Sequence, residues 1–299
     1  MNTIEFPEFT GFDIKDQSFV NLFVARFNPL FCEYNFTNLF CWQKPARLSW
    51  CLYRGRLLIY DGIDECSFMP LGDAFSPREL VNLSKKMEDI GLKPDFALAT
   101  EDYINEFPEI SDYYIVEQKR DYAEYIYNVD DLCSLKGKKL AKKKNLISQF
   151  KRSFPDFKIE LFADFFKQGV SDLAEKMSGP AGIGQEFSAL ATALDYFKDL
   201  KLKGLVLLNK NRVAGFSIFS PVSSEGATMT YDIHFEKADR DFKGASQMIN
   251  HGTAEYLKDK CKYLNREQDL GLKGLRQSKM SYNPAALAIP LSLTLISRG

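Results

Sequence analysis

An acid and a histidine alternate along a strand-like run in the second half of the chain. In Thr228 to Phe235, a period of two places Asp232 and His234 on one face. A carboxylate and an imidazole two residues apart can act as a general base and the group that orients it. The alternative is a structural pair, or a pair that faces water. The second histidine, His251, falls inside an expected helix and is assigned to structure.

The densest mixture of acids, bases and glycines is LNREQDLGLKGLRQSKMSYNP, from Leu264 to Pro284. It begins with a short strand-like run, and Gly271 and Gly274 favour a loop that leads into a short helix. Sites of α/β proteins gather at strand ends, whereas a solvated helix laced with salt bridges is the alternative. The ionisable candidates of this segment are Arg266, Glu267, Asp269, Arg276, Lys279 and Tyr282.

Cations dominate a second segment, LKGKKLAKKKNLISQFKRSFP, which starts at Leu135 and has no acid between Lys136 and Arg152. Helical spacing puts apolar residues near one face and predicts that Lys138, Lys142 and Lys143 project elsewhere. In a chain of formal net charge -1, this is a candidate footprint for tRNA phosphates, an anionic lipid surface or a phosphorylated cofactor. A solvated helix between domains is the alternative. The candidate phosphate-binding residues are Lys138, Lys139, Lys142, Lys143 and Lys144.

A turn before an expected helix is the last candidate for anion binding. Free N–H groups and the dipole at a helix start attract anions. The candidate residues there are Lys243, Gly244, Ala245 and Ser246, although two aspartates, Asp239 and Asp241, precede them.

Two similar series of elements must position these residues. In each half, two strands form a hairpin, at ARLSWCLYRGRLLIYDG and KGLVLLNKNRVAGFSIFSP, and a third strand, a helix and a fourth strand follow. The helices are expected at Pro77 to Ile90 and at about Gly244 to Lys260. The runs YYIVEQKRD and AEYIYNV complete the first half, and the final apolar run completes the second. The pattern predicts two α/β units with mixed sheets, in domains 1–135 and 136–299.

Composition narrows the class of protein. The 299 residues, 45% hydrophobic and 26% charged, are typical of an ordinary globular chain. The six cysteines form no CxxC pair, so neither a zinc site nor a disulfide framework is indicated, and no metal site is predicted. No apolar run approaches the roughly 18 residues of a spanning helix, and the N-terminus has no signal-peptide pattern. We therefore expect a cytoplasmic protein whose membrane contact, if it has any, is peripheral.

The element order resembles the GNAT acyl-coenzyme A N-acyltransferase fold, and its duplication resembles the aminoacyl-tRNA-dependent transferases that carry two GNAT units. More specifically, the segments from Leu135 and Leu264, with the tandem layout, resemble the family of the phosphatidylglycerol lysyltransferase C-terminal domain, from about Ser18 to Leu295. This resemblance implies an acyl or aminoacyl transfer fold. It assigns no residue roles and leaves donor, acceptor and acyl specificity open.

Residue chemistry suggests roles in such a transfer, which needs a base, oxyanion donors and an acid for the leaving group. Asp232 or Glu267, with His234, is expected to take the proton, and Tyr282 to protonate the leaving group. Substrate contacts are expected from Arg266, Asp269, Arg276 and Lys279, with Arg276 or Lys279 near the oxyanion or the tRNA 3′ end and Asp269 on a substrate ammonium.

Three functions follow in order of preference. The first is transfer of an aminoacyl group from tRNA to a lipid, peptide or small-molecule acceptor. The second is acyl-coenzyme A-dependent N-acyl transfer, which the turn at Gly244 favours, although the flanking aspartates depart from the family pattern. The third is a binding module that keeps the fold without turnover. The first unit is expected to be mainly structural, because proline at Pro77 removes an amide that an anion would need.

Overall fold

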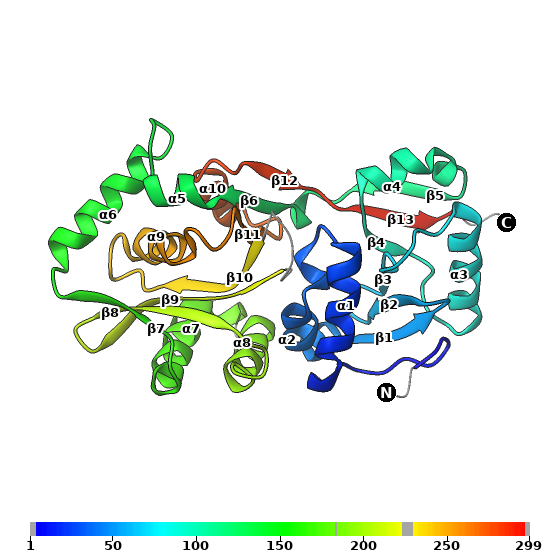
Figure 1. Cartoon of the computed structure of the whole chain (residues 1–299), viewed down its shortest axis with the longest axis horizontal. Coiled ribbons are helices and arrows are strands. Elements are labelled where there is room, and N and C mark those ends of the chain that lie inside the picture. Colours follow the sequence, from blue (N-terminus) through cyan, green and yellow to red (C-terminus); the bar gives the residue numbers. More distant parts are fainter. Residues whose placement is uncertain (1–3, 183, 223–229, 297–299) are drawn as a thin grey trace. The chain divides into compact units, whose positions relative to one another are not determined.

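The chain divides into two compact units in the computed structural model, which describes residues 4–182, 184–222 and 230–296 (Figure 1). The first unit comprises Met1–Ala123 with Ala288–Gly299, and the second comprises Glu124–Leu287. Within the described residues, none of the helices has the length and apolar character needed to cross a membrane. Each unit has its own sheet and its own buried core.

The first unit has a mixed sheet in the order β1-β2-β3-β4-β13-β5 among the described residues. Only β3 and β4 pair in parallel; the other neighbours are antiparallel. Its helices are α1 Gln17–Phe27, α2 Phe36–Ala46, α3 Pro77–Asp89 and α4 Glu101–Glu106, and its strands are β1 Leu48–Tyr53, β2 Arg56–Asp61, β3 Cys66–Phe68, β4 Phe96–Ala99, β5 Tyr114–Gln118 and β13 Leu291–Leu295. Single 3-10 turns lie at Ile14–Asp16, Cys32–Tyr34, Pro108–Asp112 and Arg120–Tyr122.

Local sequence explains where α3 begins and which face it buries. Ser76 and Glu79 form a capping box, and Pro77 occupies the first turn, where its missing N–H costs no helical hydrogen bond. The side chains of Leu80, Leu83 and Met87 are buried in the first core. The helix predicted from this spacing is confirmed.

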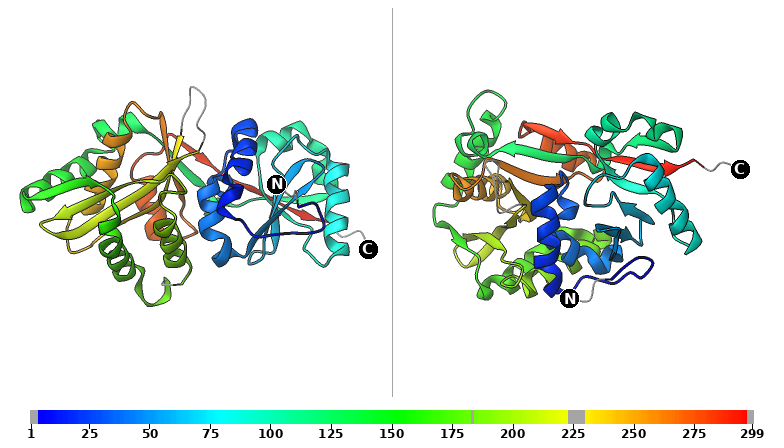
Figure 2. Two further views of the ribbon diagram at one scale, coloured as in Figure 1. Left: turned by 60° about the horizontal axis from the view of Figure 1, so that its bottom comes forward. Right: turned by 45° about the vertical axis from the view of Figure 1, so that its right-hand side comes forward.

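The second unit has a mixed sheet in the order β12-β6-β11-β10-β9-β8-β7. Helix α9 with α5 and α6 lies on one face, and α7 with α8 lies on the other (Figure 1, Figure 2). The helices are α5 Val129–Ser134, α6 Ala141–Ser153, α7 Lys167–Gly182, α8 Gln185–Asp195, α9 Ala245–Leu257 and α10 Lys273–Met280, with a 3-10 turn at Asp164–Phe166. The strands are β6 Glu124–Asn128, β7 Phe157–Leu161, β8 Lys203–Asn209, β9 Arg212–Pro221, β10 Thr230–Ala238, β11 Tyr263–Gln268 and β12 Ala286–Ala288.

The predicted duplication of element order is confirmed. The series α1, α2, β1, β2, β3, α3, β4 recurs as α7, α8, β8, β9, β10, α9, β11. Both hairpins turn where expected, at Arg54–Gly55 and at Lys210–Asn211. At the first turn both residues have positive φ, 50° and 73°, as a two-residue type I′ turn requires.

The last strand of each half joins the other sheet, which differs from the expected division at 135/136. β13, red in Figure 1, pairs with β4 and β5 of the first unit, although it was expected to complete the second. β6 pairs with β11 of the second unit, although AEYIYNV was expected to complete the first. Alternation of apolar and polar residues specifies which face of a strand is buried but not which strand it pairs with. The sequence pattern therefore could not reveal this exchange.

Candidate active site

The parallel strands β10 and β11 of the second unit separate at the point where the chain carries its candidate residues. They pair from Thr230 and Tyr263 as far as Asp232 and Asn265, and both strands continue beyond that pair. Asp232 is fully buried at this last paired position. The strand expected from Thr228 begins at Thr230, and Thr228 lies outside the described residues.

A β-bulge in β10 contains His234. The register with β9 shifts between Ile233 and Phe235, so that an extra residue is accommodated on β10. Ile233 belongs to the core under α9, and Glu236 accepts a hydrogen bond from Asn250 of that helix at 3.4 Å. The bulge thus keeps Ile233 and Glu236 toward α9, whereas strict alternation would have put them on opposite faces.

A second bulge, in β11, presents Glu267. The register with β6 shifts between Asn265 and Gln268, and Glu267 has a φ of 52°, an uncommon conformation for a residue with a side chain. The side-chain oxygen of Asn265 accepts the Glu267 N–H at 2.9 Å and stabilises this turn. Backbone strain of this kind persists only when the surroundings hold it, and it concentrates at functional sites.

Lys279 holds the bulge from α10. Its ammonium donates hydrogen bonds to the carbonyl oxygens of Arg266 at 2.6 Å and Glu267 at 3.1 Å, and also to that of Gln268. The side chain is buried, as expected for an ammonium that has several acceptors. We expected Lys279 to contact substrate; in the structure it supports the backbone that carries Glu267.

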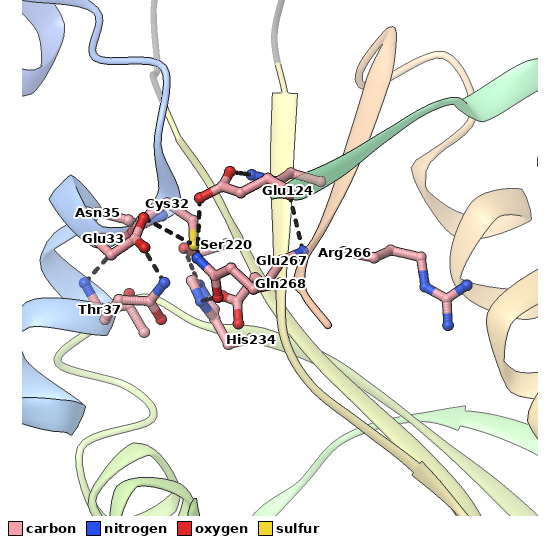
Figure 3. A network of polar contacts seen from close by, with 12 residues as sticks. Cys32, Glu33, Asn35, Thr37, Glu124, Ser220, His234, Arg266, Glu267 and Gln268 are labelled. Atoms are coloured by element: carbon pink, nitrogen blue, oxygen red, sulfur yellow. Dashed lines mark hydrogen bonds and ion pairs between the residues drawn. The ribbon is translucent and has the colours of Figure 1, made fainter. Parts of the chain in front are cut away.

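Glu124 of β6 clamps the same bulge from its other side. Its carboxylate accepts hydrogen bonds from the amides of Asn265 and, at 3.2 Å, Gln268. Both amides belong to residues that flank the bulge, and Figure 3 shows Glu124 with Gln268. Glu124 was not among the residues predicted from the sequence, because only the pairing of β6 with β11 brings it here.

A hydroxyl, an imidazole and a carboxylate form a chain of hydrogen bonds across three strands. Ser220 Oγ of β9 lies 2.8 Å from His234 Nε2, and His234 Nδ1 lies 3.3 Å from Glu267 Oε1 (Figure 3). A carboxylate beside Nδ1 favours the tautomer that carries its proton there, which leaves Nε2 able to accept the hydroxyl proton. This set, called the Ser220 relay below, has the connectivity of a base with its orienting acid.

Two predicted catalytic residues, His234 and Glu267, therefore contact each other, and Ser220 was missed. Nothing in FSIFSP distinguishes Ser220 from Ser217, the other serine of that run. Its role depends on the register in which Ser220 lies opposite Asp232, one residue from the bulge.

Asp269 and Arg276 pair with each other. Arg276 donates to the Asp269 carboxylate through Nε at 2.9 Å and Nη2 at 2.8 Å, and Tyr125 and the Gly271 N–H donate to it as well. Burial by itself would raise the pKa of Asp269, but these hydrogen bonds outweigh burial and hold the pKa well below its usual range. The pair ties the loop after β11 to α10 instead of leaving the carboxylate for a substrate ammonium, as we had expected.

Arg266 and Tyr282 lie on the α9 side of the bulge. Arg266 extends away from His234 and Glu267 (Figure 3) and donates to Glu236 at 2.7 Å. Its guanidinium lies 4.9 Å from the centre of the Tyr282 ring. Burial raises the pKa of Tyr282 to about 12, although Arg266 acts in the opposite direction. The structure thus groups Tyr282 with Arg266 and apart from the Ser220 relay, and a phenol of this pKa is a weak proton donor.

The basic segment forms α6 and the turn before it. Lys138, Lys139, Lys142 and Lys144 are exposed, as expected for phosphate-binding side chains. Lys143 is buried, contrary to the prediction that it projects away from the protein. Its ammonium lies 4.0 Å from the centre of the Tyr282 ring, because α6 packs with that position toward the sheet.

The turn before α9 is packed beneath α6. Gly244 has a φ of 93°, and a Cβ placed on it would lie 2.6 Å from the Leu146 carbonyl oxygen. Ala245 is also buried, whereas Lys243 and Ser246 are exposed. Helix α6 therefore lies directly against the turn at Gly244.

The aspartates of this turn are neutralised by internal cations. Asp239 accepts from Lys176 at 2.8 Å and from Arg212 at 2.5 Å, and Asp241 accepts from Lys176 at 2.5 Å. Burial opposes ionisation of Asp239, but the Lys176 hydrogen bond lowers its pKa overall. The expected repulsion of an anion by these acids is thus largely offset.

Solved structures place the fold in a known class. The chain is similar over 96% of its length to a conserved protein of unknown function from Bacteroides thetaiotaomicron, with 27% identity, a TM-score of 0.87 and 99% of that chain covered. L-PGS from Bacillus licheniformis gives 14% identity and a TM-score of 0.66, with 98% of this chain and 94% of that chain covered. A tandem GNAT protein from the clavulanic acid biosynthesis pathway gives 10% identity and a TM-score of 0.52, with 98% and 99% covered.

These likenesses confirm the predicted fold, a mixed α/β protein built from two GNAT-like units. The chain belongs to the family described as phosphatidylglycerol lysyltransferase, C-terminal, whose model matches residues 25–289. No protein of curated function matches the sequence significantly. The family and the tandem fold are those of a transferase, as the sequence had indicated.

Proposed function

We propose that this protein transfers an aminoacyl group from tRNA to the amine or hydroxyl of an acceptor, with the Ser220 relay as the proton-transfer machinery. The observation that carries the proposal is the chain Ser220 Oγ, His234, Glu267 at the point where β10 and β11 separate. Membership of a lysyltransferase family supports an aminoacyl group as the cargo.

The relay can carry the proton that ester aminolysis or transesterification must move from the acceptor to the leaving ribose oxygen. As the acceptor attacks the ester carbonyl carbon, its proton passes to Ser220 Oγ while the Ser220 proton passes to His234 Nε2. Glu267 stabilises the imidazolium that forms. When the tetrahedral intermediate collapses, the bond to the ribose oxygen breaks and the proton returns along the same path to that oxygen.

The two bulges explain how the chain holds this geometry. The bulge in β10 places His234 beside β9, and the bulge in β11 turns Glu267 toward it. Lys279 and Glu124 fix the backbone and side chains around Glu267. A base held by its surroundings in one orientation needs little reorganisation during the reaction.

Acyl-coenzyme A remains the second candidate donor, and the exposed Lys243 and Ser246 at the start of α9 are what favour it. The packing of Gly244 against Leu146 counts against it, because α6 lies close over the turn and the Ala245 N–H is already bonded to the Phe242 carbonyl oxygen. The third candidate function is that of a binding protein without catalytic activity, in which Ser220, His234 and Glu267 would only stabilise the fold.

The test is a transfer assay with lysyl-tRNA carrying labelled lysine, vesicles of phosphatidylglycerol, and soluble amines as separate acceptors. His234→Asn should lower the rate by about 10²–10⁴-fold, the usual contribution of a general base. His251→Asn is the matched control, because His251 bonds the Leu132 carbonyl within the helical layer and lies outside the relay. Equal activity of the two variants would rule out the relay, and turnover of acetyl-coenzyme A alone would establish the second donor.

A further inference from the structure

Two buried cations gather around one tyrosine on the α9 side of the second unit. Lys143 Nζ of α6 lies 4.0 Å from the centre of the Tyr282 ring, and Arg266 Cζ of β11 lies 4.9 Å from it. One carboxylate faces them, that of Glu236, which accepts from Arg266 Nη2 at 2.7 Å and from Asn250. The group thus carries two positive charges and one negative charge.

The burial of these cations is unusual for groups so incompletely paired. Lys143 is 8% exposed and the Arg266 side chain 11% exposed. Among the described residues, no carboxylate forms an ion pair with Lys143, and Arg266 Nη1 is buried without an acceptor. Lysine and arginine are rarely buried without partners, because removing a charge from water is costly.

The Tyr282 ring only partly compensates Lys143. A cation over an aromatic face gains on the order of 0.5–2 kcal/mol. Burial, followed by repulsion from Arg266 and Lys142, lowers the pKa of Lys143 to about 8. The ammonium is thus held in a place where the protein alone stabilises it poorly, as expected of a site completed by an anion.

The surroundings identify the class of anion. Exposed Lys142 and Lys144 flank Lys143 on α6 and extend the positive surface outward. Arg266 stands next to Glu267 in one bulge, and the two side chains leave the strand in different directions (Figure 3). A group bound at Arg266 therefore lies away from Glu267, across the bulge, which suits a phosphate that the ribose of the terminal nucleotide separates from the reacting ester.

We propose that Lys143 and Arg266 form a buried subsite for a phosphate group of the donor's terminal nucleotide. Arg266 donates through Nη1, and Lys143 contributes its ammonium above Tyr282. The assignment of this phosphate to the donor rests on the proposed function; the subsite itself rests on the two incompletely paired cations.

The subsite predicts a definite pH dependence. The charged groups around Lys143 are Lys142 on its own helix, Arg266 on β11 and Glu236 on β10; Tyr282 and Tyr127 are neutral at working pH, and α9 contributes the uncharged Asn250. Phosphate binds the ammonium form of Lys143. The affinity of the subsite for phosphate should therefore be highest below pH 8 and should fall above pH 8, where Lys143 loses its proton. Between pH 7.5 and 9.5 the charges of a phosphodiester and of AMP are nearly constant, so a change in their binding there reports the protein. Inorganic phosphate still loses a proton near pH 7, so its binding reports the protein only above about pH 8.5.

The experiment compares Lys143→Met with Lys151→Met in the full-length chain. Methionine keeps an apolar contact with Tyr282, and Lys151 is an exposed lysine at the end of the same helix. Binding of deacylated tRNA, AMP and inorganic phosphate is measured by calorimetry across that pH range. Lys143→Met should weaken binding by roughly tenfold or more, the scale of a lost charge-assisted bond, and abolish the decline above pH 8.

A second readout locates the phosphate without a substitution. The wild-type protein is labelled with acetic anhydride at pH 8.5, with and without inorganic phosphate, and acetylation is measured lysine by lysine. Phosphate should slow acetylation of Lys143 at least threefold and leave Lys151 unchanged. Equal protection of both lysines, or wild-type affinity in Lys143→Met, would overturn the subsite and leave Lys143 as a packing residue.

Further measurements distinguish the possible sources of the phosphate. They also distinguish a failure of the subsite from a failure of the proposed function. Loss of coenzyme A binding or of phosphatidylglycerol-vesicle binding in Lys143→Met, with tRNA binding intact, would overturn the assignment to the donor nucleotide. If phosphate protects Lys143 but no aminoacyl-tRNA is consumed, the subsite stands and the proposed function fails. If transfer proceeds and Lys143→Met is as active and as tightly bound as wild type, the function stands and the subsite fails.

Discussion

At the scale of single residues, the site depends on side chains that act on one another. Glu267 has a strained backbone, and Asn265 and Lys279 bond to that backbone directly. Residues of similar chemistry therefore have different functions here: Lys279 supports a bulge, whereas Lys143 lies over an aromatic ring with no carboxylate beside it among the described residues. Residue type alone does not distinguish these roles.

Ser220→Ala should lower kcat of aminoacyl transfer and leave KM nearly unchanged. The hydroxyl is in the proposed path of the proton, so its loss affects the transition state more than substrate binding. We expect a decrease of about 10²-fold, measured by steady-state transfer across pH 6 to 9. Ser217→Ala is the matched control on the same strand: Ser217 is buried, and its hydroxyl has no partner among the described residues. A common loss in both variants would indicate a packing effect.

Asp269→Asn should destabilise the second unit at neutral pH and much less in acid. The folded-state pKa of Asp269 is depressed below its unfolded value, so its stabilising effect is present above about pH 4 and is lost as the pH falls toward the folded pKa. Urea unfolding at pH 7 should show that the free energy of unfolding of the variant is lower by about 1.5–3 kcal/mol, the range for hydrogen bonds to a charged group. The free energy of unfolding of the wild type should exceed that of Asp269→Asn by less at pH 3.5 than at pH 7. An equal difference at both pH values would contradict a stabilising role for the ionised carboxylate.

At the scale of elements, close packing of helices determines which termini a ligand can reach. Helix α6 lies over the turn before α9 because Gly244 has no side chain, and the same helix directs Lys143 inward and its neighbours outward. An amphipathic helix predicted from spacing alone gives the apolar stripe correctly. It does not reveal that one lysine borders that stripe closely enough to be buried.

Gly244→Ala should displace α6 and destabilise the second unit. The new Cβ would lie 2.6 Å from the Leu146 carbonyl oxygen and 3.0 Å from the Phe150 Cβ, and the φ of this residue is positive. We therefore expect the free energy of unfolding to fall by about 1–3 kcal/mol. Gly274→Ala in α10 is the control, because a Cβ there meets no atom within 4 Å and alanine favours a helix. Thermal unfolding of the two variants should shift in opposite directions, and a neutral Gly244→Ala would show that α6 packs loosely.

At the scale of the whole molecule, each sheet contains a strand from the far end of the other half. β13 lies between β4 and β5, and β6 lies beside β11, where its Glu124 reaches the β11 bulge. The chain therefore closes the first unit only after the second has been synthesised. Division at residue 135 would separate both units from strands that they need.

The fragments 1–135 and 136–299 should not fold when produced separately. Without β13, β4 and β5 lose the strand between them, and without β6, β11 loses its neighbour and Glu124. Circular dichroism and limited proteolysis should show unfolded, rapidly degraded fragments, and co-expression should restore a protected complex. Cooperative unfolding of isolated 1–135 would mean that the strand exchange is dispensable.

The local features of this protein follow from its amino-acid sequence alone. The hairpins, the capped helix α3, the duplicated element order and the dense polar segment after β11 all depend on periodicity and turn chemistry, which act over a few residues. The pairing of Asp269 with Arg276, seven residues apart, is also within reach of such local reasoning, but no sequence pattern indicated that the two residues bond to each other.

Contacts between residues that are distant in the sequence depend on the three-dimensional fold. Ser220, His234 and Glu267 converge because two bulges shift the register of neighbouring strands, and a register shift leaves no mark in the alternation of residues. Glu124 and β13 reach their places through strand exchange, which the pattern of either half cannot encode. Lys143 is buried because of the packing angle of α6. Pairing partners, register and packing are contacts between segments far apart in the chain, so local sequence constrains them weakly.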